Sequence, residues 1–88
     1  MIKLEKMRCG YAICVEDENF LIVPQEDVAY EEIKIYAASA CGYASFTYHV
    51  AGSIWDTTNF YHTFDNQHDA FRYFMKIKYN CEVIKIEN

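Results

Sequence analysis

The chain contains few residues that bend or break the backbone. Its 88 residues include three glycines and one proline. Gly10, Gly42 and Gly52 stand apart from one another, and none of them begins a G-x-G-x-x-G motif or a P-loop. Because such glycine-rich loops hold phosphate groups through backbone N–H donors, a nucleotide-binding loop is not expected.

Basic side chains are also scarce in the middle of the chain. Between Cys9 and Phe71 the only basic residue is Lys34, against ten acidic residues, and the net charge of the whole chain is −5. Nucleic-acid binding needs several lysines or arginines on one face, so direct DNA or RNA binding is not expected. The segregated charge instead favours association with a basic partner.

Metal-binding motifs and membrane-length hydrophobic runs are absent from the sequence. The four cysteines form no C-x-x-C and the three histidines no H-x-x-x-H, so neither a metal site nor a cofactor is expected. The run Gly10–Val15 is too short for a signal peptide or membrane span, and three acids follow it. We therefore expect a cytoplasmic protein with reduced thiols, with a disulfide pair as the alternative.

Length and composition predict one small domain, residues 1–88, with one hydrophobic core. Aromatic residues make up 17% of the chain, and a core of this size cannot bury all of them. Some exposed rings would suit protein interfaces, in which tyrosine and tryptophan are frequent anchors. The simpler interpretation of any single ring is an aromatic residue in a small sheet.

The first half of the chain predicts a hairpin followed by a helix. Residues 2–15 alternate between apolar and polar as one long strand, or as two short strands broken near Gly10. Residues 20–23 form the next strand, which ends at Pro24. The apolar spacing then changes and predicts a helix over 26–41 that stops at Gly42, with a strand beginning near Ile33 as the competing interpretation.

The second half predicts another hairpin, a helix and a last strand. Residues 43–50 alternate as a half-buried strand and 60–64 form its partner, with the turn at either 51–53 or 56–59. A second helix is expected over 66–79, capped by Asp65 or Asn66 and closed by Asn80, before a strand over 81–86. The order β-β-α-β-β-α-β predicts an α+β fold, with an antiparallel or mixed sheet and both helices on one face.

The residue types associated with catalysis occur in unfavourable positions. Cys41 is expected near the end of the first helix, where the helix dipole disfavours a thiolate nucleophile. The paired carboxylates lie on a predicted turn and on a predicted solvated helix face instead of in a cleft. We therefore expect a protein that is not an enzyme.

The remaining interpretation is an acidic module that binds another protein. In size, acidity and aromatic content the chain resembles small phage-encoded inhibitors of bacterial defence, including anti-CRISPR proteins, many of which block nucleic-acid sites. This resemblance is one of type, and no residue is carried over from it. It implies a basic protein partner, for example a nucleic-acid enzyme. The expected contacts are Glu16, Asp17, Glu18, Glu26, Asp27, Glu31 and Glu32, with Tyr30 as an aromatic anchor.

Two other functions remain open from the sequence. The exposed rings and a free strand edge suit a self-associating structural or regulatory homodimer. A pocket between protomers would suit a small-molecule sponge. His49, Tyr61 and His62 are second-choice partner contacts, because the hairpin expected over 43–64 is polar and aromatic on its outer face.

Overall fold

The computed structural model describes residues 3–48, 53–55 and 61–86, with the backbone alone at 53–55 and 61. Six strands and two helices lie within these ranges. In chain order they are β1 (Leu4–Met7), β2 (Gly10–Val15), β3 (Glu18–Pro24), α1 (Tyr30–Phe46), β4 (Ser53–Trp55), β5 (Tyr61–Thr63), α2 (Gln67–Tyr79) and β6 (Cys81–Lys85).

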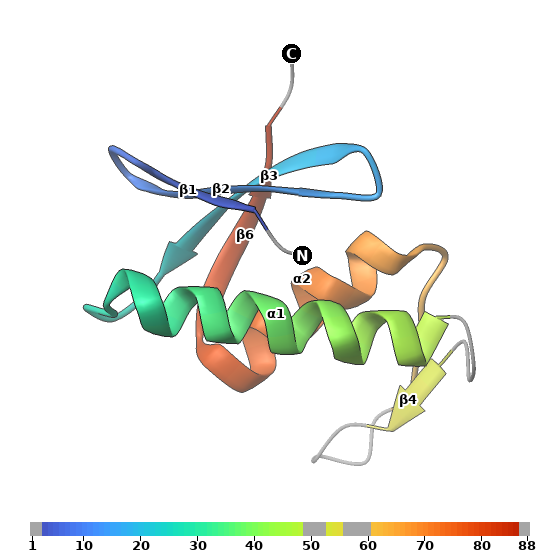
Figure 1. Ribbon diagram of the computed structural model, residues 1–88. Coiled ribbons are helices and arrows are strands. Elements are labelled where there is room, and N and C mark those ends of the chain that lie inside the picture. The colour runs from blue at the N-terminus through green and yellow to red at the C-terminus, as the bar shows by residue number, and fades with distance from the viewer. Residues whose placement is uncertain (1–2, 49–52, 56–60, 87–88) are drawn as a thin grey trace.

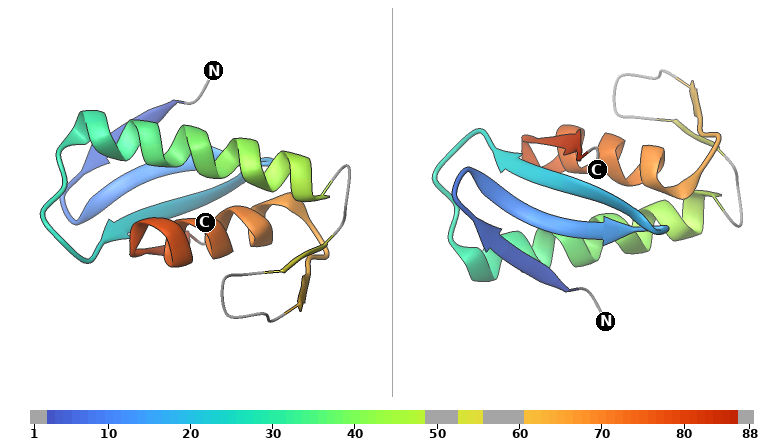
Figure 2. Two further views of the ribbon diagram at one scale, coloured as in Figure 1. Left: turned by 90° about the horizontal axis from the view of Figure 1, so that it is seen from below. Right: turned by 90° about the horizontal axis from the view of Figure 1, so that it is seen from above.

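Four of the strands form an antiparallel sheet in the order β1-β2-β3-β6. Both helices lie on the same face of this sheet, and the opposite face carries no helix (Figure 1). Seen from above, the sheet therefore lies in front and the helices behind it (Figure 2). The predicted α+β class, with both helices on one face, is confirmed.

The first extended segment is divided into two strands, β1 and β2, and β2 begins at Gly10. Arg8 and Cys9 form the turn between Met7 and Gly10, which are paired. A Cβ atom at Gly10 would lie 2.5 Å from the carbonyl oxygen of Ile22 on β3. The close approach of β3 at this point therefore requires glycine.

A two-residue turn joins β2 to β3. Val15 pairs with Glu18, and the two residues between them, Glu16 and Asp17, have φ angles of 53° and 64°. Positive φ at both central positions defines the type I′ turn, whose twist matches that of the flanking strands. Aspartate tolerates this conformation, whereas glutamate adopts it rarely.

Helix α1 occupies a different range from the one predicted. It begins at Tyr30 instead of residue 26, and it runs past Gly42 to Phe46, so the expected stop at Gly42 and the strand over 43–50 are wrong. Ala44 is fully buried and Phe46 is 64% exposed, because these two residues lie on opposite sides of a helix instead of one face of a strand. No side chain caps the start of α1.

The second hairpin is shorter than expected and forms a sheet of its own. β4 pairs with β5 through Ser53↔Thr63, Ile54↔His62 and Trp55↔Tyr61. The strand predicted over 60–64 therefore exists, but its partner is β4. This register excludes a turn at 51–53, and the alternative turn at 56–59 lies outside the described residues.

Helix α2 and strand β6 match the prediction to within one residue. The side chain of Asn66 caps α2 by accepting a hydrogen bond from the backbone N–H of Asp69 at 2.9 Å. Asn80 ends the helix in the left-handed conformation, with φ 54° and ψ 44°. The chain can then enter β6 at the next residue, which places the two elements side by side.

The core lies between the sheet and the two helices. Its largest fully buried side chains include Phe20, Phe71 and Phe74, which come from β3 and α2. Helix α1 contributes Ile33 and three fully buried alanines, Ala37, Ala40 and Ala44. These small residues let α1 approach its neighbours closely, so the bulky rings of α2 and β3 fill most of the interior.

Candidate functional site

The seven predicted contact acids fall into two groups at opposite ends of the sheet. Three of them lie in or beside the turn between β2 and β3, and the other four lie between β3 and the first turn of α1 (Figure 1). Strand β3 separates the groups over seven residues, which corresponds to roughly 20 Å at about 3.3 Å per residue. The seven acids therefore form two separate patches instead of one continuous acidic surface.

Most of the acids at the β2–β3 turn make contacts within the protein. One oxygen of the Glu16 carboxylate lies 2.8 Å from the backbone nitrogen of His68, which donates a hydrogen bond to it. The Glu18 carboxylate lies 3.4 Å from Nζ of Lys85. Asp17 is exposed and makes no hydrogen bond or ion pair with a described residue. Two of the three acids are thus already occupied within the chain.

The other group, here named the acidic end, consists of Glu26, Asp27, Glu31 and Glu32. All four side chains are exposed, and none forms an ion pair within the described part of the chain. Glu26 accepts a hydrogen bond of 3.5 Å from the side-chain amide of Asn80. Glu31 and Glu32 lie in the first turn of α1, where the helix dipole stabilises negative charge by about 0.3–1 kcal/mol per residue.

The predicted anchor, Tyr30, has a structural contact instead of a free ring. Its hydroxyl donates a hydrogen bond to the backbone carbonyl of Leu4 at 2.8 Å, and its ring centroid lies 6.0 Å from that of Tyr11. Nζ of Lys34 lies 5.6 Å from the Tyr30 centroid. Tyr30 therefore fastens α1 to the edge strand β1.

A stacked pair of tyrosines, missed by the sequence analysis, lies beside the acidic end. The rings of Tyr36 and Tyr79 are nearly parallel, with centroids 4.4 Å apart and an interplanar angle of 10°. Desolvation raises the pKa of Tyr36, and the nearby carboxylates of Glu32 and Glu26 raise it further. Because the two tyrosines are far apart in the sequence, no local pattern could have predicted their contact.

The basic residues of the two terminal segments do not gather at one end of the molecule. Lys3 and Lys6 belong to the β1 side of the molecule, whereas Lys76, Lys78 and Lys85 belong to α2 and β6. β1 and β6 are the opposite edge strands of the sheet. The basic residues are thus divided between the two edges of the sheet, whereas the four acids of the acidic end lie together.

His62 is the one second-choice contact whose side chain lies within the described part of the structure. His49 lies outside the described residues, and only the backbone of Tyr61 is described, in β5. His62 is half-buried, with its ring centroid 4.4 Å from that of Tyr73 and 6.4 Å from that of Phe64. His62 therefore helps to attach the small hairpin to α2.

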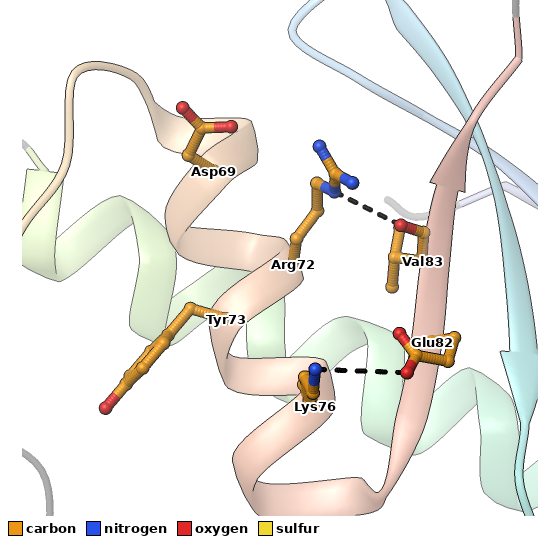
Figure 3. A pocket seen from close by; sticks show the side chains of 6 residues that line it. All are labelled: Asp69, Arg72, Tyr73, Lys76, Glu82 and Val83. Atoms are coloured by element: carbon orange, nitrogen blue, oxygen red, sulfur yellow. Dashed lines mark hydrogen bonds and ion pairs between the residues drawn. The ribbon is translucent and has the colours of Figure 1, made fainter.

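An open groove of about 300 Å³ lies between α2 and β6, lined by Asp69, Arg72, Tyr73, Lys76, Glu82 and Val83 (Figure 3). Nε of Arg72 donates a hydrogen bond to the backbone carbonyl of Val83 at 3.2 Å, and Nζ of Lys76 lies 3.9 Å from Glu82. The charges of the two acidic and two basic side chains that line this groove cancel. Arg72 occupies a backbone acceptor of an edge strand, which protects that edge against pairing with another chain.

Three further features bear on chemistry. Cys41 lies within α1 instead of near its end, and burial raises the pKa of its thiol to about 11. Among the described residues, no group of three or more histidine, cysteine or acidic side chains is placed to hold a metal ion. No helix in the described ranges is long and apolar enough to cross a membrane.

Comparisons with protein-family models, with curated proteins and with solved structures gave no match for this chain. The functional argument therefore depends on the surface itself. The acidic end is the site that the geometry supports best, because its four exposed carboxylates form no ion pair with a described residue and lie beside the Tyr36–Tyr79 stack.

Proposed function

We propose that the protein is a non-enzymatic, cytoplasmic binding module whose acidic end occupies a basic surface of another protein, such as the nucleic-acid-binding surface of an enzyme. The observation that carries this proposal is the set of four exposed carboxylates at one end of the molecule, none of them in an ion pair with a described residue. Such a surface is attracted to a lysine- and arginine-rich channel over a distance of about 10 Å at 0.1 M salt.

Charge alone speeds the encounter, and a stable complex also needs contacts that slow dissociation. The Tyr36–Tyr79 stack offers such a contact, because its rings are already fixed against each other. A preorganised aromatic pair loses little conformational entropy when a partner covers it. Arginine side chains of the partner would also bind favourably to the ring faces.

The test is capture of partners from a lysate, repeated at low and high salt and with a competing DNA or RNA oligonucleotide. We compare the wild type with the double variant Glu31→Lys/Glu32→Lys. The matched control is Asp17→Lys/Asp65→Lys, which changes the net charge equally at the opposite end of the molecule, where both residues are exposed. Glu31 and Glu32 lie in the first turn of α1. Asp65 precedes α2, and Asp17 follows Glu16, which contacts the first turn of α2. Both double variants therefore place positive charge near the N-terminus of a helix.

The proposal expects a basic partner that the wild type and the control both retain at low salt. High salt and the oligonucleotide should each release it. The Glu31/Glu32 variant should bind it at least tenfold more weakly, mainly through slower association. Equal capture by wild type and this variant at every salt concentration, or the same loss in the control, would show that the acidic end is not the site.

A further inference from the structure

The side of α1 that points away from the sheet is uncharged along most of its length. From Ile35 to Phe46 the helix contains no charged residue. Ile35 and Phe46 are 62% and 64% exposed, the two highest values among the large hydrophobic residues of the described ranges. Seen from below, α1 lies in front of the sheet, and no other described helix or strand crosses it (Figure 2). The outer side of a surface helix is normally charged, so this side indicates a contact surface.

The outer side of α1 has the residue spacing that helices use to pack along one another. Its central line, here named the seam, consists of Ile35, Ser39, Gly42 and Phe46. These residues are four, three and four positions apart, as in the contact line of a coiled coil. The seam lies opposite the side of α1 that is buried against the core. A Cβ atom at Gly42 would meet no atom within 4 Å, so another backbone can approach α1 closely at the middle of the seam.

The seam continues into the acidic end. Glu31 and Glu32 lie four and three positions before Ile35, and therefore about one helical turn further along the same side. Both carboxylates are exposed, and neither forms an ion pair with a described residue. A partner that covers the seam thus meets uncompensated negative charge at one end of it. Charge complementarity requires a cation of the partner at this end.

We propose that the seam binds an amphipathic α-helix of the partner protein, which has an apolar contact face and lysine or arginine in its last turn. The inference rests on the proposed function and names the element that the acidic end recognises. An antiparallel helix places its C-terminal end over Glu31 and Glu32, where basic residues also interact favourably with the dipole of their own helix. Its largest apolar side chain should lie over Gly42, because the seam is bulky at its ends and small at its middle.

A second copy of this chain fits the seam less well than a basic helix does. The last turn of α1 contains no basic residue, so two antiparallel α1 helices would leave Glu31 and Glu32 of each copy without a cation. Two parallel α1 helices would bring the carboxylates of both copies together, which is repulsive. The charge at the end of the seam therefore favours a different protein as the occupant.

The experiment measures the binding of two dye-labelled synthetic peptides to the full chain by fluorescence anisotropy. Both peptides are alanine-rich helices of about 18 residues with leucine at the heptad contact positions. One has two arginines in its last turn, and the other has two glutamines in their place. Wild type should bind both, and it should bind the arginine peptide about fivefold more tightly, which is the effect of two exposed ion pairs.

Three variants locate the contact. Phe46→Asp places a charge in the seam and should weaken the binding of both peptides about tenfold or more. Glu31→Gln/Glu32→Gln should remove the advantage of the arginine peptide and leave the glutamine peptide nearly unaffected. The matched control for Phe46→Asp is Ile84→Asp, which adds the same charge at an exposed isoleucine of β6 and should leave both affinities unchanged. Circular dichroism establishes that each variant is folded, and Phe46→Ser replaces Phe46→Asp if the latter is not.

Several results would overturn the inference. No binding of either peptide up to about 1 mM, or equal binding by wild type and Phe46→Asp, would exclude the seam as a helix site. The proposed function would survive these results, because the acidic end can engage a basic surface of another shape; it fails instead if Glu31→Lys/Glu32→Lys captures partners from a lysate as wild type does. Equal affinity of wild type for the two peptides would show that the acidic end takes no part in the contact. A dimer in sedimentation equilibrium that Phe46→Asp abolishes would assign the seam to a second copy.

Discussion

The carboxylate of Glu16 accepts a hydrogen bond of 2.8 Å from the backbone N–H of His68, which lies 52 positions further along the chain. His68 is in the first turn of α2, where backbone N–H groups have no partner within the helix. The turn between β2 and β3 thus supplies a negative charge to the positive end of a helix. One of the acids predicted to bind a partner instead holds the sheet against α2.

Replacing Glu16 with alanine should lower the free energy of unfolding. The comparison variant is Asp17→Ala in the same turn, where both residues have positive φ. Because aspartate tolerates this conformation better than alanine and glutamate does not, Asp17→Ala carries the larger backbone cost. A larger loss of stability in Glu16→Ala would therefore report on the Glu16–His68 contact. We expect Glu16→Ala to be the less stable by about 1 kcal/mol, or about 4–8 °C in melting temperature. A melting temperature of Glu16→Ala at or above that of Asp17→Ala would contradict this expectation.

The sequence predicted most elements because their signals are local. The stop at Asn80 and the cap at Asn66 depend on residues within one turn of each helix end. The sequence predicted Asn80 as the end of the helix and either Asp65 or Asn66 as its cap, and the structure selects Asn66. Helix α1 was misplaced because its signals are misleading. Gly42 is a typical helix stop, but it lies inside the helix at an exposed position, where the missing side chain costs only about 1 kcal/mol.

The candidate site was predicted in part. The four residues of the acidic end were identified from their local density of charge, which a sequence shows directly. Their separation from Glu16 and Glu18 follows from the direction of β3, and the use of Glu16 by α2 follows from packing between distant segments. The Tyr36–Tyr79 stack also results from packing between distant segments. Neither this stack nor the contact of Glu16 with α2 has a signal in a short stretch of sequence.

Two glycines should respond to alanine in opposite directions. At Gly10 a Cβ atom would lie 2.5 Å from the Ile22 carbonyl oxygen, so Gly10→Ala must push β2 and β3 apart and should cost more than about 2 kcal/mol. At Gly42 the corresponding atom has no neighbour within 4 Å, so Gly42→Ala should stabilise α1 by about 0.5–1 kcal/mol. Urea unfolding of both variants measures these changes, and a destabilised Gly42→Ala would contradict the open position of this residue.

Asn80 should tolerate glycine and not alanine. Its φ of 54° places it in the left-handed region, which glycine adopts without a steric penalty and alanine does not. We expect Asn80→Ala to lower the free energy of unfolding by about 1 kcal/mol and Asn80→Gly to leave it nearly unchanged. Thermal unfolding of the two variants makes the comparison. Equal losses would instead assign the role of Asn80 to its side chain and the 3.5 Å hydrogen bond to Glu26.

Alkaline pH should destabilise the fold through its buried thiols. Burial raises the pKa of Cys41 from 9.0 to about 11 and also raises the pKa of Cys81. Between pH 9 and about 11 the folded chain therefore keeps protons that the unfolded chain has lost, so stability is intact below pH 9 and falls as the pH rises through this interval. Chemical unfolding across this range should show a smaller decline for Cys41→Ala than for wild type. The exposed Cys14 provides the control, since Cys14→Ala should follow the wild-type curve. An unchanged pH dependence in Cys41→Ala would show that the Cys41 thiol does not contribute.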